Sequence, residues 1–106
     1  MVYKQLYQRL VDRICKGAGE SSIQLRQAAF DNKNMPEVMA SLVNKVAYEA
    51  YKITDNDIAE VKAAGINEDQ LFEIIICSAI GQASRQYKSG LAALAEATKD
   101  GDDYAA

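Results

Sequence analysis

The chain contains no histidine, the side chain most often used for proton transfer and metal binding near neutral pH. It also has no tryptophan, one proline and two cysteines, Cys15 and Cys77, which lie far apart in the sequence. Their separation matches neither a zinc site nor a Cys-x-x-Cys redox pair. No glycine-rich phosphate-binding loop is present. We therefore predict no metal site and no cofactor.

Long apolar runs are missing as well. The longest, residues 74–77, is far too short to span a bilayer, and the N-terminal stretch has no apolar signal-peptide core. The net charge is −3 and the isoelectric point is near 4.9, so the basic surface that binds nucleic acid or anionic membranes is absent. These features predict a cytoplasmic protein with reduced thiols and with neither nucleic-acid nor membrane partners.

The residues that are present favour helices. Apolar residues recur at helical spacing throughout the 106 residues, and no segment alternates with a period of two. We predict an all-α fold, a compact bundle of about five helices with a long C-terminal helix. Residues 1–98 form a single helical domain in this interpretation, and residues 99–106 form an acidic, flexible tail. From capping residues and glycine breaks, the predicted helices are 2–16, 22–31, 36–53, 54–64 and 67–97.

The last predicted helix is too long for a compact domain of this size. Its length of about 45 Å exceeds the diameter of about 26–30 Å expected for one subunit. Its predicted apolar stripe is Phe72, Ile75, Ile76, Ala79, Ala83, Tyr87, Leu91 and Leu94. A kink at Gly81 or Gly90 would shorten the helix. Close approach by a neighbouring helix would compensate for the low helix propensity of these two glycines. We favour a homo-oligomer with Tyr87, Leu91 and Leu94 at its interface.

The segment TDNDIAEVKAAG-INEDQLFEIII combines a short capped helix, a glycine turn, an Asn-Glu-Asp cap and the start of a long helix. Over residues 37–95 the chain resembles AhpD-like members of the carboxymuconolactone decarboxylase superfamily. The resemblance implies an all-α fold that assembles as a dimer, trimer or hexamer. Active AhpD-like enzymes carry a Cys-x-x-Cys-x-x-x-His motif before that glycine. Here the matching positions hold Ala50, Ile53 and Asp57, so the resemblance implies a retained scaffold without thiol chemistry.

The long helix carries four weak catalytic candidates, Glu73, Cys77, Arg85 and Tyr87, each with a structural alternative. Cys77 lies among isoleucines, which favours a buried, unreactive thiol over a lone peroxidatic or sensor thiol. Glu73 is either a solvated carboxylate near the start of the helix or a partly buried acid paired with Arg85 or Lys62. In the second case it could act as a general acid or base.

A polar cluster follows one to two turns later, formed by Gln82, Arg85, Gln86 and Tyr87. Amide, guanidinium and phenol groups together can bind a small anionic or carbonyl ligand. The simpler interpretation is a hydrogen-bond network between subunits.

Three functional hypotheses follow. The leading one is a non-catalytic, AhpD-like helical scaffold or interaction protein that acts as a homo-oligomer. The second is a carboxymuconolactone decarboxylase-like enzyme that uses Glu73, Arg85 and Tyr87 on a small peroxide, lactone or carbonyl substrate. The third is a module that binds a small molecule in a pocket between subunits.

Overall fold

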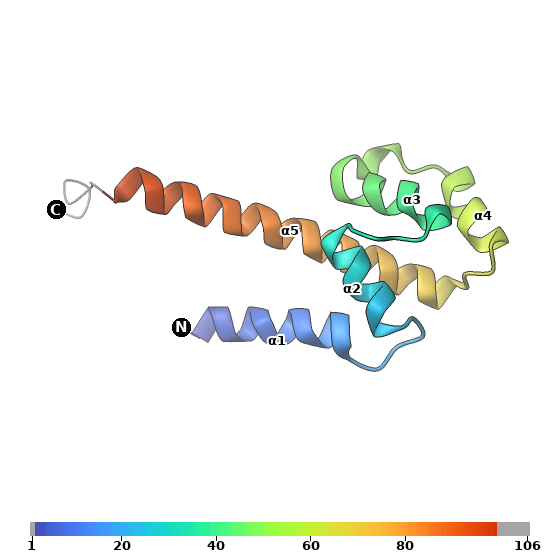
Figure 1. Ribbon diagram of the computed structural model, residues 1–106, viewed down its shortest axis with the longest axis horizontal. Helices are drawn as coiled ribbons and strands as arrows, with labels where there is room; N and C mark the ends of the chain where they lie inside the picture. The colour runs from blue at the N-terminus through green and yellow to red at the C-terminus, as the bar shows by residue number, and fades with distance from the viewer. Residues whose placement is uncertain (1, 100–106) are drawn as a thin grey trace.

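The computed structural model describes residues 2–99, so the predicted tail lies outside the described residues except for Lys99. The described part of the chain is all-α and contains no strand. Figure 1 shows α2, α3 and α4 gathered around the first half of a long C-terminal helix, with α1 alongside it. The helices are α1 (Val2–Lys16), α2 (Ile23–Asp31), α3 (Glu37–Tyr48), α4 (Asp55–Ala63) and α5 (Glu68–Thr98).

The helix starts follow the capping residues seen in the sequence. The Ser22 side chain caps α2 by accepting a hydrogen bond from the backbone N–H of Leu25. Thr54 and Asp57 form a reciprocal capping box at the start of α4, in which each side chain accepts a hydrogen bond from the other residue's backbone N–H. Asn67 and Gln70 form the same arrangement at α5. These contacts satisfy backbone N–H groups that have no partner within the helix.

The third helix is shorter than predicted. It ends at Tyr48 rather than at Ile53, and a 3₁₀ turn, Ala50–Lys52, replaces its last turn. The reason is the cap that follows, because an N-cap residue must adopt an extended backbone. Thr54 does so, with φ −113° and ψ 165°. The chain therefore leaves the helical conformation early enough to begin α4.

The core lies between α2, α3, α4 and the first half of α5, with the C-terminal end of α1 closing one side. Gly81 lies directly against α2, and a Cβ placed there would be 2.6 Å from the Phe30 carbonyl carbon. The predicted close approach at Gly81 is therefore confirmed. The buried apolar residues are Cys15, Ala29, Met39, Leu42, Val43, Val61, Leu71, Ile74 and Cys77.

The apolar stripe predicted for α5 is not the face that packs on the core. In that stripe only Ile75 and Ile76 are half-buried, and the other members are exposed. The core-facing side is narrower and richer in small residues, which allow α2 to approach the α5 backbone closely. Its buried members are Leu71, Ile74, Cys77, Ser78, Gly81 and Ser84.

The C-terminal end of α5 extends beyond the rest of the described chain (Figure 1). In Figure 1, α1 runs antiparallel beside α5, and α5 continues past the N-terminal end of α1. Tyr87 still lies beside α1, since its ring centroid is 6.1 Å from that of Tyr7. Residues 86–98, here called the overhang, are all exposed. The described residues extend 59 × 29 × 20 Å and have a radius of gyration of 17.0 Å, so the outline is elongated where compactness was predicted.

Candidate functional site

Glu73 holds the loop between α1 and α2 against α5. Its Oε2 accepts a hydrogen bond from the backbone N–H of Glu20 and its Oε1 accepts one from Ser21, each at 2.7 Å. Gly19 lies directly over the carboxylate, and a Cβ there would be 2.8 Å from Oε2. Glu73 is half-buried and pairs with neither Arg85 nor Lys62, the two predicted partners.

These contacts favour the charged form of Glu73. Burial would raise the pKa of the carboxyl, but the hydrogen bonds from Glu20 and Ser21 and the positive charge of Arg26 lower the pKa below its ordinary value of 4.5. A carboxylate with both oxygens occupied and a lowered pKa is poorly suited to give up a proton as a general acid. The geometry therefore assigns Glu73 a structural role in fixing the loop.

Replacing Glu73 with glutamine is expected to lower the free energy of unfolding by about 1–2 kcal/mol, because charge-assisted hydrogen bonds to the loop are lost. Because the pKa of Glu73 is lower in the folded than in the unfolded state, its carboxylate stabilises the fold at pH values above the unfolded-state pKa. This stabilisation is lost as the pH falls through the folded-state pKa. The native protein should therefore lose stability below about pH 4.5, and E73Q should lose less over the same range. Urea unfolding at several pH values measures both effects.

Glu96 provides the control for this experiment. It lies on an exposed part of the same helix and, among residues 2–99, its ion-pair partner is the exposed Lys99. E96Q removes one negative charge without touching the loop, so it should keep the acid dependence of the native protein. Equal acid dependence in E73Q and E96Q would contradict the role given to the Glu73 carboxylate.

The two cysteines come together in the core, although they are far apart in the sequence. Cys77 is fully buried, Cys15 is 2% exposed, and Cys77 Sγ lies 3.7 Å from the carbonyl oxygen of Ile14. Burial raises the pKa of both thiols, and that of Cys77 reaches about 12. Since the thiolate is the reactive form, the environment agrees with the predicted buried, unreactive Cys77.

Arg85 closes the C-terminal end of α2. Its Nη1 donates to the carbonyl oxygen of Phe30 at 2.6 Å, and its Nε and Nη2 donate to Gln82 Oε1 at 3.2 and 2.9 Å. Tyr87 is 60% exposed and stacks beside Tyr7. Arg85 lies twelve positions after Glu73 on α5, a distance of about 18 Å along the axis. The structure therefore does not bring Glu73, Arg85 and Tyr87 into one site.

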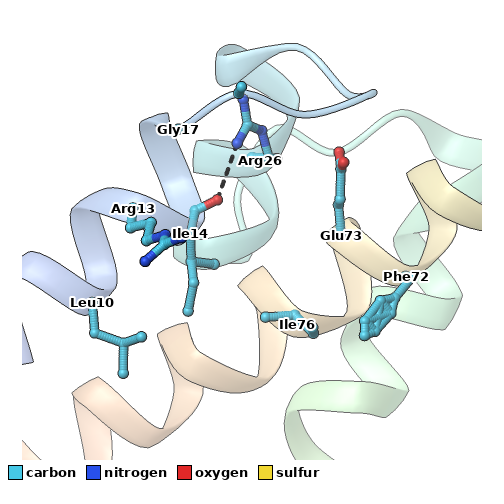
Figure 2. Close-up of a pocket in the computed structure, with 9 residues that line it drawn as sticks. Leu10, Arg13, Ile14, Gly17, Arg26, Phe72, Glu73 and Ile76 are labelled. Atoms are coloured by element: carbon cyan, nitrogen blue, oxygen red, sulfur yellow. Dashed lines mark hydrogen bonds between the residues drawn. The ribbon is translucent and has the colours of Figure 1, made fainter.

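A groove between α1 and α5 contains charged residues that the sequence analysis missed. Figure 2 shows apolar side chains from both helices, with Arg13 beside Ile14 on α1 and Arg26 at the top of the view. Its volume is about 600 Å³, and it is called the α1–α5 groove here. Among its lining residues are Leu10, Arg13, Arg26, Phe72, Glu73 and Ile76. Arg26 interrupts the apolar positions of α2, and that polar interruption is the signal that could have identified it.

Comparison of the chain with protein-family models, with curated proteins and with solved structures gave no match. The resemblance to AhpD-like proteins therefore stays a prediction. Within residues 2–99, no group of three or more histidine, cysteine, aspartate or glutamate side chains is arranged to hold a metal ion. None of the helices in this range is long and apolar enough to cross a membrane.

Proposed function

We propose that the protein is a non-catalytic helical scaffold or interaction protein that acts as a homo-oligomer through the overhang of α5. The supporting observation is a long helix whose last residues, 86–98, are exposed and include large apolar side chains. Tyr87, Leu91 and Leu94 are 60%, 47% and 59% exposed. They recur at helical spacing, so they lie on one face of α5. Exposed apolar patches of this kind mark interaction sites.

The two glycines inside α5 provide a second argument. A glycine within a helix costs about 1 kcal/mol relative to alanine unless something compensates for it. At Gly81 the compensation is α2, which lies too close for any side chain. At Gly90 a Cβ would have no atom within 4 Å of it, so the chain itself offers no reason for glycine. A neighbouring helix from a second copy would supply one.

Gly90 lies on the same face of α5 as the apolar side chains of the overhang. Leu94 follows it by four residues and Tyr87 precedes it by three, both of which are neighbours on a helix surface. The overhang also contains several alanines, so its backbone is accessible to a second helix. Symmetric dimers are the commonest homo-oligomers, and a dimer would bury the same face of both copies.

The described side chains favour this function over the carboxymuconolactone decarboxylase-like alternative. Both oxygens of Glu73 are bound to the loop, and Arg85 is bound to the end of α2. Tyr87 lies on the exposed face of α5, away from Glu73 along the helix. The alternative enzyme needs these three groups to meet around one substrate, and they are spread along the helix instead.

Replacing Gly90 with alanine tests the proposal. In an isolated chain the change should raise stability by about 1 kcal/mol, since only helix propensity is affected. In the proposed oligomer, the new methyl group lies where the neighbouring helix packs. G90A is therefore expected to raise the dissociation constant about tenfold or more while the circular dichroism of the helix is kept. Sedimentation velocity across a dilution series measures the change.

Ser89→Ala is the matched control because Ser89 is exposed, adjacent in sequence and on the opposite face of α5. Serine to alanine also raises helix propensity. S89A should therefore gain stability without any change in association. If G90A behaves like S89A, no helix packs closely against Gly90.

A further inference from the structure

The α1–α5 groove contains a buried guanidinium group with unused hydrogen-bond donors. We propose that this groove binds a monocarboxylate with an apolar tail, with the carboxylate on Arg26 and Arg13. The proposal concerns a different surface from the overhang of α5 and does not rest on the oligomer.

Arg26 is the central residue of the argument. It is 4% exposed, and its Nη1 donates to the carbonyl oxygen of Ile14 at 3.1 Å. This bond satisfies one of the last carbonyls of α1, and it accounts for one of the five N–H donors of a guanidinium. Within residues 2–99, the buried Nε has no hydrogen-bond partner. A buried charge with unused donors is costly, and binding an anion would reduce that cost.

The unused edge of Arg26 suits a carboxylate. A guanidinium binds a carboxylate through two parallel N–H bonds, and with Nη1 occupied, the edge formed by Nε and Nη2 is left for this purpose. Since Nε is shielded from solvent, the guanidinium must turn slightly toward the groove to engage a ligand. Figure 2 shows Arg26 above the groove, with its Nη1 bond to Ile14 directed toward α1.

Arg13 adds a second positive charge to the same groove. Among the described residues, neither Arg13 nor Arg26 has a carboxylate oxygen within 4.0 Å, whereas five lysines form ion pairs. The negative charge of Glu73 is already bound by two backbone N–H groups of the loop. Two guanidinium groups therefore line the groove, and Glu73, the carboxylate on the same wall, is influenced by the charge of Arg26 but forms no contact ion pair with it.

The apolar side chains of the groove determine which kind of tail the carboxylate ligand carries. Leu10, Phe72 and Ile76 line the groove with apolar surface, and Leu10 and Phe72 are 48% and 55% exposed. An apolar tail would cover them, and this burial is favourable. The volume of about 600 Å³ lies within the range of small-molecule sites. Glu73 on the same wall repels a second negative charge, so a monocarboxylate fits better than a phosphate or a dicarboxylate.

Titration of the full chain with octanoate tests this site by two-dimensional NMR. Octanoate should bind, and octan-1-ol and octylamine should bind more weakly because neither carries a carboxylate. The Arg26 Nε–H resonance should shift during the titration, which reports on the buried guanidinium directly. Arg13→Gln should weaken octanoate binding about tenfold through loss of a charge-assisted contact.

Arg9→Gln is the matched control because Arg9 lies one turn earlier on α1, is exposed and does not line the groove. R9Q should bind octanoate as the native chain does. Absence of octanoate binding, equal binding of octan-1-ol, equal losses in R9Q and R13Q, or an unmoved Arg26 resonance would each overturn the proposal.

Discussion

Replacing Gly81 with alanine is expected to destabilise the folded chain by about 3 kcal/mol or more. The added Cβ would lie 2.6 Å from the Phe30 carbonyl carbon and 2.8 Å from its Cα. These are backbone atoms near the end of α2, so no side-chain rotation can relieve the clash. The two helices would have to separate, which would also strain the bond from Arg85 to the Phe30 carbonyl oxygen. Urea unfolding followed by circular dichroism measures the loss.

Gly90→Ala is the internal comparison for this experiment. It makes the same substitution in the same helix where no atom lies within 4 Å. The two variants should therefore change folding stability in opposite directions. A G81A protein with the stability of the native chain would contradict the packing of α2 on α5.

Replacing both Leu91 and Leu94 with aspartate is expected to abolish association. Each leucine contributes about 1.5–3 kcal/mol when it is buried, so losing both should raise the dissociation constant at least about a hundredfold. The variant should sediment as a monomer of 11.6 kDa. Folding should be little affected, because both side chains are exposed and lie outside the core of the single chain.

Ser89→Asp is the control for charge in the overhang. Ser89 is exposed on the opposite face of α5, so its replacement adds a carboxylate to the same helix without touching the apolar face. S89D should associate like the native chain. If S89D dissociates as fully as the double variant, added charge alone explains the loss and the apolar face is not the interface.

Much of the fold could be predicted because its signals are local. Ser22, Thr54 and Asn67 mark helix starts through contacts with the residue three positions later. The length of α5 could likewise be predicted, since its helical pattern is uninterrupted. The predicted end of α3 was wrong. The apolar periodicity continues to Ile53, but the chain leaves the helix earlier because the residue that caps α4 needs an extended backbone.

The candidate site was harder to predict because its contacts join distant segments. Glu73 binds loop residues more than fifty positions earlier, and no sequence spacing indicates that pairing. Arg26 lies on a short helix where its burial depends on how α1 packs. The face of α5 was also misassigned, because small residues such as Ser78 and Gly81 join Leu71 and Ile74 in the core contact. Large apolar side chains of the predicted stripe, such as Phe72, are exposed instead.

The mass of the native chain in solution decides whether the chain associates through the overhang of α5. Sedimentation velocity over a wide dilution series should give a species of at least twice 11.6 kDa that dissociates on dilution. This result is expected because the overhang of α5 leaves Tyr87, Leu91 and Leu94 about half exposed in the single chain. A single species of 11.6 kDa at every concentration would contradict the account.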